Sequence, residues 1–188
     1  MAKIYRESHK EQPCIDDSVI SQAQKGDKDA LGRIYDTYIN PIFRYQFSRV
    51  GNKFDAEDLT SQTFMAILES LPRYKFHGYF SAWVFRIARN KAMDFFRAQR
   101  RNLGEMPLHL TYHDDVLEKI IQGQTCEELS ALLQSLKEEE REVIRLRYVA
   151  QLTYIEIACI LGRKEDAVRK SLTRLLEKLS CQLEVQDV

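Results

Sequence analysis

Residues 152–179 read LTYIEIACILGRKEDAVRKSLTRLLEKL, and this stretch has the spacing of a helix-turn-helix unit. Ala158 is small enough to let two helices approach closely, and Gly162 can adopt the left-handed backbone that a tight turn needs. Val168 is expected to anchor the second helix, which would begin near Lys164 or Glu165. The remaining apolar positions supply a core between the helices: Ile157, Ile160, Leu161, Leu172, Leu175 and Leu179.

The expected second helix carries a basic face. In major-groove docking, the N-terminal residues of such a helix reach base edges while flanking Lys and Arg side chains hold phosphates. Acidic residues at its start suit the positive end of the helix dipole without any contact to DNA. A carboxylate there can also accept a hydrogen bond from the amino group of cytosine. A helical hairpin that binds nothing is the alternative, but three constrained positions and a basic helix together favour duplex DNA binding. The candidate contacts are Arg163, Lys164, Glu165, Arg169, Lys170 and Arg174.

Upstream, residues 71–101 combine positive charge with aromatic rings. They hold eight basic side chains against one acid, Asp94, in a chain with 28 basic and 28 acidic residues overall. Basic groups neutralise phosphates and aromatic rings stack on bases, so this composition favours single-stranded nucleic acid. An ordinary amphipathic surface helix is the alternative, but a solvated face usually mixes charges of both signs.

This basic segment divides into a loop and a long helix, expected from about Ser81 to Arg101. The loop Tyr74–Tyr79 holds too many aromatic side chains to bury them all, so some of them could stack on an extruded base. Phe80 and Trp83 are expected to pack beneath the helix instead. The candidate contacts are Tyr74, Lys75, Phe76, His77 and Tyr79 in the loop, and Arg86, Arg89, Asn90, Arg97 and Arg100 on the helix.

Almost the whole chain is predicted to be helical, because Gly and Pro are scarce and no long segment alternates apolar and polar residues. Asp27 is expected to cap one helix, which breaks at Gly51, and Asp55 to cap the next. The acidic, irregular stretch after the basic helix is typical of a linker. The chain therefore divides into an N-terminal tail (1–17), a helical domain (18–101), a flexible linker (102–126), a helix-turn-helix domain (127–183) and a C-terminal tail (184–188). The apolar stripe of the helix that Asp55 would cap is Phe64, Ile67, Leu68 and Leu71.

Composition argues against several other classes. No apolar run approaches the roughly 20 residues that a membrane-spanning helix needs, and the polar N-terminus is no signal peptide, so we expect a cytoplasmic protein without membrane insertion. The four cysteines are widely separated, which favours buried reduced thiols over disulfides or zinc. We find no nucleotide-binding loop, metal cluster or nucleophile–base pattern, and therefore predict neither a cofactor, a metal nor an enzymatic activity.

Four segments of the chain together resemble the bacterial RNA polymerase sigma-70 family, in its small extracytoplasmic-function (ECF, group 4) type. AQKGDKDALGRIYDTY (23–38) looks like the start of region 2, and DAEDLTSQTF (55–64) resembles the segment that docks on the polymerase clamp helices. FSAWVFRIARNKAMDFFRAQRR (80–101) is similar to the helix that melts promoters and reads the −10 element. EEEREVIRLRYVAQLTYIEIACILGRKEDAVRKSLTRLLEKL (138–179) looks like region 4, which reads the −35 element.

The resemblance implies an all-α protein of two small domains that straddles core RNA polymerase. It would bind duplex promoter DNA at −35, bind single-stranded promoter DNA at −10, and promote melting, with an anti-sigma factor as a candidate regulator. A stand-alone helix-turn-helix regulator of duplex DNA is the alternative, but it leaves the basic aromatic segment without a role. By the same resemblance, the polymerase contacts would be Asp55, Asp58, Gln62 and Phe64.

Overall fold

The computed structural model describes residues 14–75, 78–103, 132–133 and 135–186. Every regular element in these ranges is helical, which confirms the predicted all-α fold. Among the described residues, none of the helices is both long and apolar enough to cross a bilayer. The elements are α1 (Asp17–Gln24), α2 (Lys28–Val50), α3 (Lys53–Ser70), the 3-10 turn η2 (Leu71–Arg73), α4 (Phe80–Leu103), α6 (Glu138–Ile144), the π-helical turn η3 (Arg145–Val149), α7 (Tyr154–Leu161) and α8 (Glu165–Gln186).

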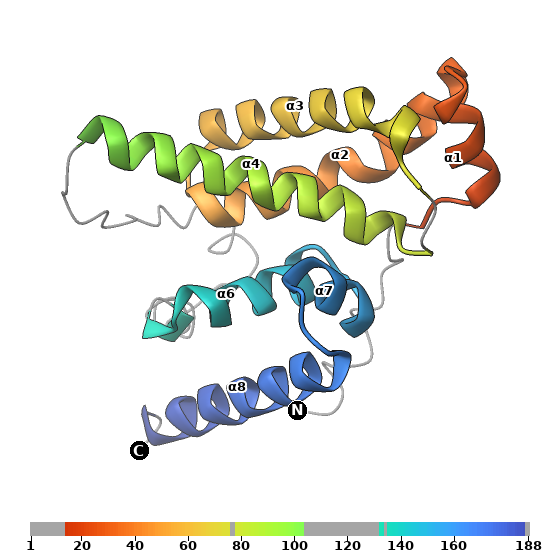
Figure 1. Cartoon of the computed structure of the whole chain (residues 1–188). Coiled ribbons are helices and arrows are strands. Elements are labelled where there is room, and N and C mark those ends of the chain that lie inside the picture. Colours follow the sequence, from red (N-terminus) through yellow and green to blue (C-terminus); the bar gives the residue numbers. More distant parts are fainter. Residues whose placement is uncertain (1–13, 76–77, 104–131, 134, 187–188) are drawn as a thin grey trace.

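The N-terminal half is built from α1 to α4, with α2, α3 and α4 packed side by side and α1 across one end (Figure 1). As predicted, the Asp27 side chain caps α2 by accepting a 2.8 Å hydrogen bond from the backbone N–H of Ala30. The helix continues through Pro41 and ends at Gly51, which has a left-handed φ of 74°. Local sequence signals therefore set both ends of this helix.

Two details of α3 differ from the prediction. Asn52, and not Asp55, caps the helix, because its side-chain oxygen accepts a 2.9 Å hydrogen bond from the Asp55 backbone N–H. Asp55 therefore lies inside the first turn, where its negative charge still suits the helix dipole. Within the expected apolar stripe, Phe64, Ile67 and Leu71 are buried as predicted, but Leu68 is 48% exposed.

The C-terminal half contains the predicted helix-turn-helix, formed by α7 and α8 with α6 and η3 packed beside them. Thr153 caps α7 in a reciprocal arrangement: its backbone N–H donates to the Glu156 carboxylate at 2.8 Å, and the Glu156 N–H points back to the Thr153 hydroxyl. Such a capping box is a strong local start signal for a helix. The three described thiols do not follow the expectation of burial, since Cys14 and Cys181 are exposed and Cys159 is half-buried, while Cys126 lies outside the described residues.

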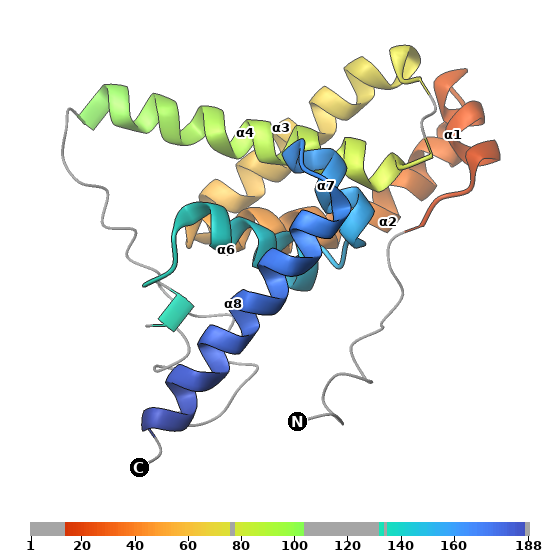
Figure 2. The same cartoon turned by 60° about the horizontal axis from the view of Figure 1, so that its bottom comes forward.

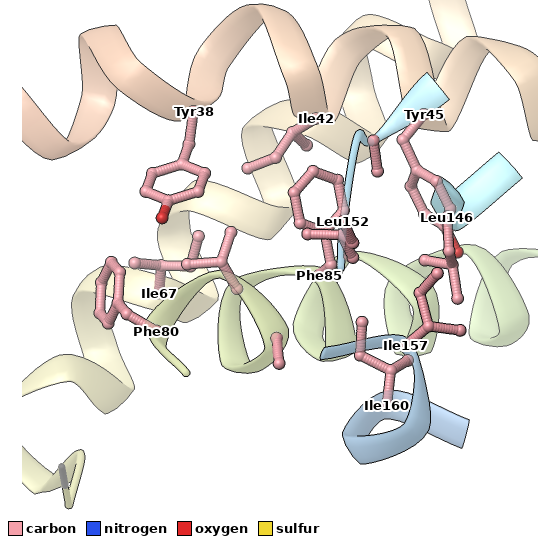
Figure 3. Packing of buried hydrophobic residues seen from close by; sticks show 14 of the residues in the cluster. Tyr38, Ile42, Tyr45, Ile67, Phe80, Phe85, Leu146, Leu152, Ile157 and Ile160 are labelled. Carbon is pink, nitrogen blue, oxygen red and sulfur yellow. The ribbon is translucent and has the colours of Figure 1, made fainter. Parts of the chain in front are cut away.

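The two halves pack against each other around one continuous apolar core. Figure 3 shows Tyr45 of α2 and Phe85 of α4 beside Leu146 and Leu152 of the C-terminal half, with Ile157 of α7 close by. Figures 1 and 2 both place α7 against α4, while α8 projects away from the N-terminal half. The structure thus shows a compact arrangement in which the C-terminal half covers part of α4.

Candidate nucleic-acid interface

The helix-turn-helix has the geometry that the three diagnostic positions predicted. Gly162 ends α7 with a left-handed φ of 65°, and α8 begins three residues later at Glu165. The backbone N–H of Arg163 donates to the Ala158 carbonyl at 3.0 Å, which closes the turn. Ala158 and Val168 are both buried, because the first is small at the helix crossing and the second fills the core beneath α8. The start of α8 is thereby held at a fixed angle on the domain.

The cations at the start of α8 face solvent, as predicted. Glu165 is half-buried in the first turn, and Asp166 is exposed beside it, so both suit the positive end of the helix. The two acids lie at one end of this surface, and the other exposed residues are basic apart from Thr173. The exposed residues of this face are Arg163, Lys164, Arg169, Lys170, Thr173 and Arg174.

Arg169 is positioned by two neighbours. The Glu165 carboxylate accepts a 2.7 Å hydrogen bond from its guanidinium, at an i,i+4 spacing that the sequence could have revealed. The guanidinium also lies 4.9 Å from the ring centre of Tyr154 in α7, and Arg147 lies at the same distance from that ring. Cation–π contacts of this kind restrict the orientation of an arginine. No local sequence pattern pairs Tyr154 with Arg169, so only the fold identifies it.

The residues of α4 that were predicted to contact the −10 region fall into two groups. Asn90, Arg97 and Arg100 are exposed on α4, with Arg97 paired to Asp94 at 3.1 Å. By contrast, Arg86 donates a hydrogen bond to the Cys159 carbonyl of α7. The side chain of Arg89 is 29% exposed, and its Nε lies 3.4 Å from the Glu142 carboxylate. Residues of the C-terminal half therefore contact two of the predicted arginines, Arg86 and Arg89.

The aromatic loop is also split between core and surface. Tyr74 is half-buried and its ring lies 5.3 Å from that of Phe80 and 4.7 Å from that of Trp83. This packing confirms the expectation that Phe80 and Trp83 support the helix from beneath. Lys75 and Tyr79 are exposed at the two ends of the loop. The predicted contacts Phe76 and His77 lie outside the described residues.

The surface predicted to contact polymerase lies on α3, on the side of the N-terminal half that faces away from α7 and α8 (Figure 1). Asp58 and Gln62 are exposed and joined by a 2.8 Å hydrogen bond, while Asp55 is half-buried. Phe64 is only 7% exposed and packs on Tyr35, with 4.8 Å between ring centres, so its side chain belongs to the core here. The predicted polymerase contacts did not include three exposed apolar side chains of the same helix: Phe54, Met65 and Leu68.

Between the two halves lies a buried polar cluster centred on Glu142 of α6, which is 3% exposed. The Tyr45 hydroxyl donates a 2.7 Å hydrogen bond to this carboxylate, and the Arg49 guanidinium donates a second. Burial and the nearby Glu142 charge raise the pKa of Tyr45, so its phenol stays a neutral donor. Burial would lower the pKa of Arg49, but the Tyr45 hydroxyl and the Glu142 carboxylate more than offset this and raise it. The Arg49 guanidinium is therefore charged in this cluster.

Comparisons with known proteins follow the same two-domain division. Residues 34–102 match the family model described as Sigma-70 region 2, and residues 126–179 match that described as Sigma-70, region 4. The ECF RNA polymerase sigma factor ShbA of Streptomyces griseus is 32% identical over 179 residues, covering 86% of this chain and 92% of ShbA. BldN, an ECF RNA polymerase sigma factor of Streptomyces coelicolor, is 33% identical over 171 residues, covering 86% of this chain.

The match spans 63% of BldN, which is less than two thirds of that protein. Among solved structures, CnrH in complex with the cytosolic domain of CnrY has a TM-score of 0.66 to this chain. The two are 24% identical, and the match covers 89% of this chain and 96% of that one. At this identity the likeness concerns the fold alone.

Proposed function

Because the chain belongs to the sigma-70 family of RNA polymerase sigma factors, in its ECF type, we propose that it directs core RNA polymerase to promoters by reading two DNA elements with its two helical domains. The observation that carries this proposal is the presence of two basic surfaces on one chain, at the start of α8 and along α4. The proposal gives the chain a recognition role within the polymerase complex and no catalytic one.

The −35 element would be read by the start of α8. An exposed basic helix end that the turn holds at a fixed angle fits the major groove, where Arg and Lys contact guanine edges and phosphates. Glu165 would position Arg169 and can also accept from a cytosine amino group. The proposed contacts remain Arg163, Lys164, Glu165, Arg169, Lys170 and Arg174.

The −10 element would be read by α4 and the loop before it. Arg97 and Arg100 are exposed in the compact chain, with Arg97 paired to Asp94, whereas Arg86 and Arg89 contact the C-terminal half and would be released when it moves away. Capture of an unstacked base by the loop would offset an unstacking cost of a few kcal/mol, so melting would need no ATP. Tyr74 already packs in the core, so among the described aromatic residues of the loop we assign base contact to Tyr79.

Core polymerase would bind the outer face of α3. Asp58 and Gln62 offer exposed polar groups, and Phe54, which is 84% exposed, and Met65 add apolar area on the same helix. Interfaces commonly combine such apolar anchors with a polar rim. Asp55 would contribute at the helix start, while Phe64 would support the face from below. We place the protein in the cytoplasm, because it would work on polymerase and chromosomal DNA there.

Family membership does not favour the alternative of a regulator that binds duplex DNA without polymerase. An anti-sigma factor stays a predicted partner. Both ideas can be tested by purifying the tagged full chain from its host: a sigma factor brings core polymerase with it, and an anti-sigma factor would co-purify in a polymerase-free pool.

The decisive experiment is run-off transcription with purified core polymerase and a library of genomic promoter fragments. We expect transcripts from a small set of promoters only when the chain is added. A matched variant, Lys170→Ala with Arg174→Ala, should reduce initiation at those promoters, whereas Lys25→Ala, an exposed lysine outside both basic surfaces, should not. Failure of the wild-type chain to support initiation on any fragment would overturn the proposed function.

A further inference from the structure

The buried cluster around Glu142 contains two residues, Tyr45 and Arg49, that belong to neither of the proposed DNA-reading surfaces. Its carboxylate comes from α6 and accepts hydrogen bonds from two side chains of the N-terminal half, the Tyr45 hydroxyl at 2.7 Å and the Arg49 guanidinium. Arg89 Nε forms an ion pair with it at 3.4 Å, and Arg145 of the C-terminal half lies 3.8 Å away. Tyr45 is fully buried and Arg49 is 6% exposed. Two hydrogen-bond donors of α2 and one ion-pair partner of α4 thus converge on a carboxylate that the other domain supplies.

A buried ion pair of this kind adds little net free energy to the contact between two domains. Desolvation of both charges can exceed their attraction, and apolar residues of similar size often stabilise a contact equally well. The surrounding contact is already apolar, with Phe85 and Leu146 packed beside the cluster. The charged cluster therefore suggests a second use for its cations.

When the domains separate, these cations lose their partners. The carboxylates that pair with Arg49 and Arg89 belong to Glu138 and Glu142, and both residues lie on α6. Movement of α6 would leave two guanidinium groups and a phenol hydroxyl directed at one vacated position. Guanidinium groups bind carboxylates and phosphates by the same charge-assisted hydrogen bonds, so an anionic oxygen would be favoured there.

The position of the cluster indicates which anion this is. Arg89 and Arg86 lie on the same helix, α4, and both contact the C-terminal half in the compact chain, although Arg86 stays exposed. The exposed cations Arg97 and Arg100 continue along the same helix. A DNA strand that follows α4 would therefore bring its backbone phosphates to the cluster, and Arg49 would extend the basic surface from α4 onto α2.

We propose that Tyr45, Arg49 and Arg89 form a phosphate-binding site for promoter DNA, which the Glu142 carboxylate fills while the two domains are packed together. The compact chain and the DNA-bound chain then compete for the same arginines. Polymerase can still dock first, because α3 lies on the side of the N-terminal half away from α7 and α8 (Figure 1). This inference rests on the proposed function and adds two contacts, Tyr45 and Arg49, that the sequence did not indicate.

The first test measures how salt weakens binding of a single-stranded −10 oligonucleotide to holoenzyme, by fluorescence anisotropy. Each phosphate contact contributes about 0.7 to the slope of log affinity against log salt concentration. Arg49→Met should reduce the slope by about this amount. Arg44→Met, which removes an exposed arginine of the same helix, is the matched control and should leave the slope unchanged. Equal slopes for the two variants would overturn the phosphate contact.

The second test does not depend on polymerase. Energy transfer is measured in the free full chain between dyes at Ser61→Cys on α3 and Ser180→Cys on α8, with the native cysteines replaced by serine. Glu142→Gln should lower transfer and strengthen oligonucleotide binding several-fold, since the neutral amide competes poorly for the arginines. Saturating oligonucleotide should also lower transfer in the chain that keeps Glu142. Unchanged transfer in that chain would show that DNA does not displace the carboxylate.

The two tests separate this inference from the function on which it rests. If the wild-type holoenzyme does not initiate transcription at all, the proposed function fails, while the energy-transfer result still decides whether Glu142 holds the domains together. If initiation is normal and neither the salt slope nor the transfer responds, only the phosphate site is wrong. Thermal unfolding of each variant shows whether an effect reflects loss of the fold.

Discussion

The hydroxyl of Tyr45 in α2 donates a 2.7 Å hydrogen bond to the carboxylate of Glu142 in α6, and both side chains are buried. This contact joins two domains that the sequence places at opposite ends of the chain. The same carboxylate also contacts Arg49 and Arg89 of the N-terminal half.

Removing the Tyr45 hydroxyl should destabilise the compact chain. Tyr45→Phe keeps the ring in the core but leaves one buried carboxylate oxygen without its donor, which typically costs about 1–2 kcal/mol. Denaturant unfolding would measure the change. Tyr35→Phe removes an exposed hydroxyl instead and should be nearly neutral. Equal stability of the two variants would mean that the hydrogen bond adds nothing.

Stability should fall at alkaline pH. Burial is the main cause that raises the pKa of both Tyr38 and Tyr45 above the ordinary tyrosine value of 10.0. The folded chain therefore holds these protons more tightly than the unfolded chain, so the stabilisation is complete below pH 10 and declines as the pH rises above it. Phenolate absorbance should show fewer ionised tyrosines in the native chain than in the denatured chain at the same alkaline pH. Coincident titrations would contradict this.

A single substitution before α7 should stabilise the helix-turn-helix. Gln151 has a φ of 57°, a left-handed backbone that costs a residue with a Cβ about 1 kcal/mol. Gln151→Gly should remove this cost and raise the melting temperature, which thermal unfolding would measure. Gln151→Ala, which keeps a Cβ, is the control and should not stabilise.

The ring of Tyr154 should matter for −35 recognition although it lies on the first helix of the unit. Arg169→Ala is expected to cost about 1–3 kcal/mol of duplex binding and to relax preference at one base pair. Tyr154→Leu should reproduce part of this loss, because Arg169 loses the ring that orients it. Tyr154→Phe keeps the ring and should bind normally. If Tyr154→Leu binds as well as the wild type, the ring does not position Arg169.

Polymerase affinity should depend on the outer face of α3. Replacing Asp58 and Met65 together by Ala is expected to weaken binding to core polymerase about tenfold, equivalent to about 1.4 kcal/mol. Glu177→Ala, which removes an exposed acid of α8, serves as the control. A titration with labelled holoenzyme would compare the two. Unaltered affinity of the α3 variant would exclude this face as the main docking surface.

Much of this protein could be read from local patterns. Asp27 and Gly51 mark the ends of α2, and the Ala158, Gly162 and Val168 spacing locates the helix-turn-helix, because caps and turns depend on neighbours in sequence. The exposed cations of α8 were predicted for the same reason, since a 3.6-residue period separates buried from exposed positions. The cap of α3 was assigned to the wrong residue. Asn52 and Asp55 are both good capping residues, and the sequence does not show at which of them the helical backbone begins.

The sequence by itself determined the helices, their capped ends and the two basic surfaces, since each depends on residues within a few turns of one another. Only the tertiary structure decided which of those basic residues are free. Glu142 meets Arg49 and Arg89 across the chain, and Tyr154 meets Arg169 across a helix crossing. Contacts of this kind leave no periodic pattern in the sequence. The sequence around an acidic residue is the same whether its carboxylate faces solvent or is buried against two arginines, and only the packing of the domains decides between these cases.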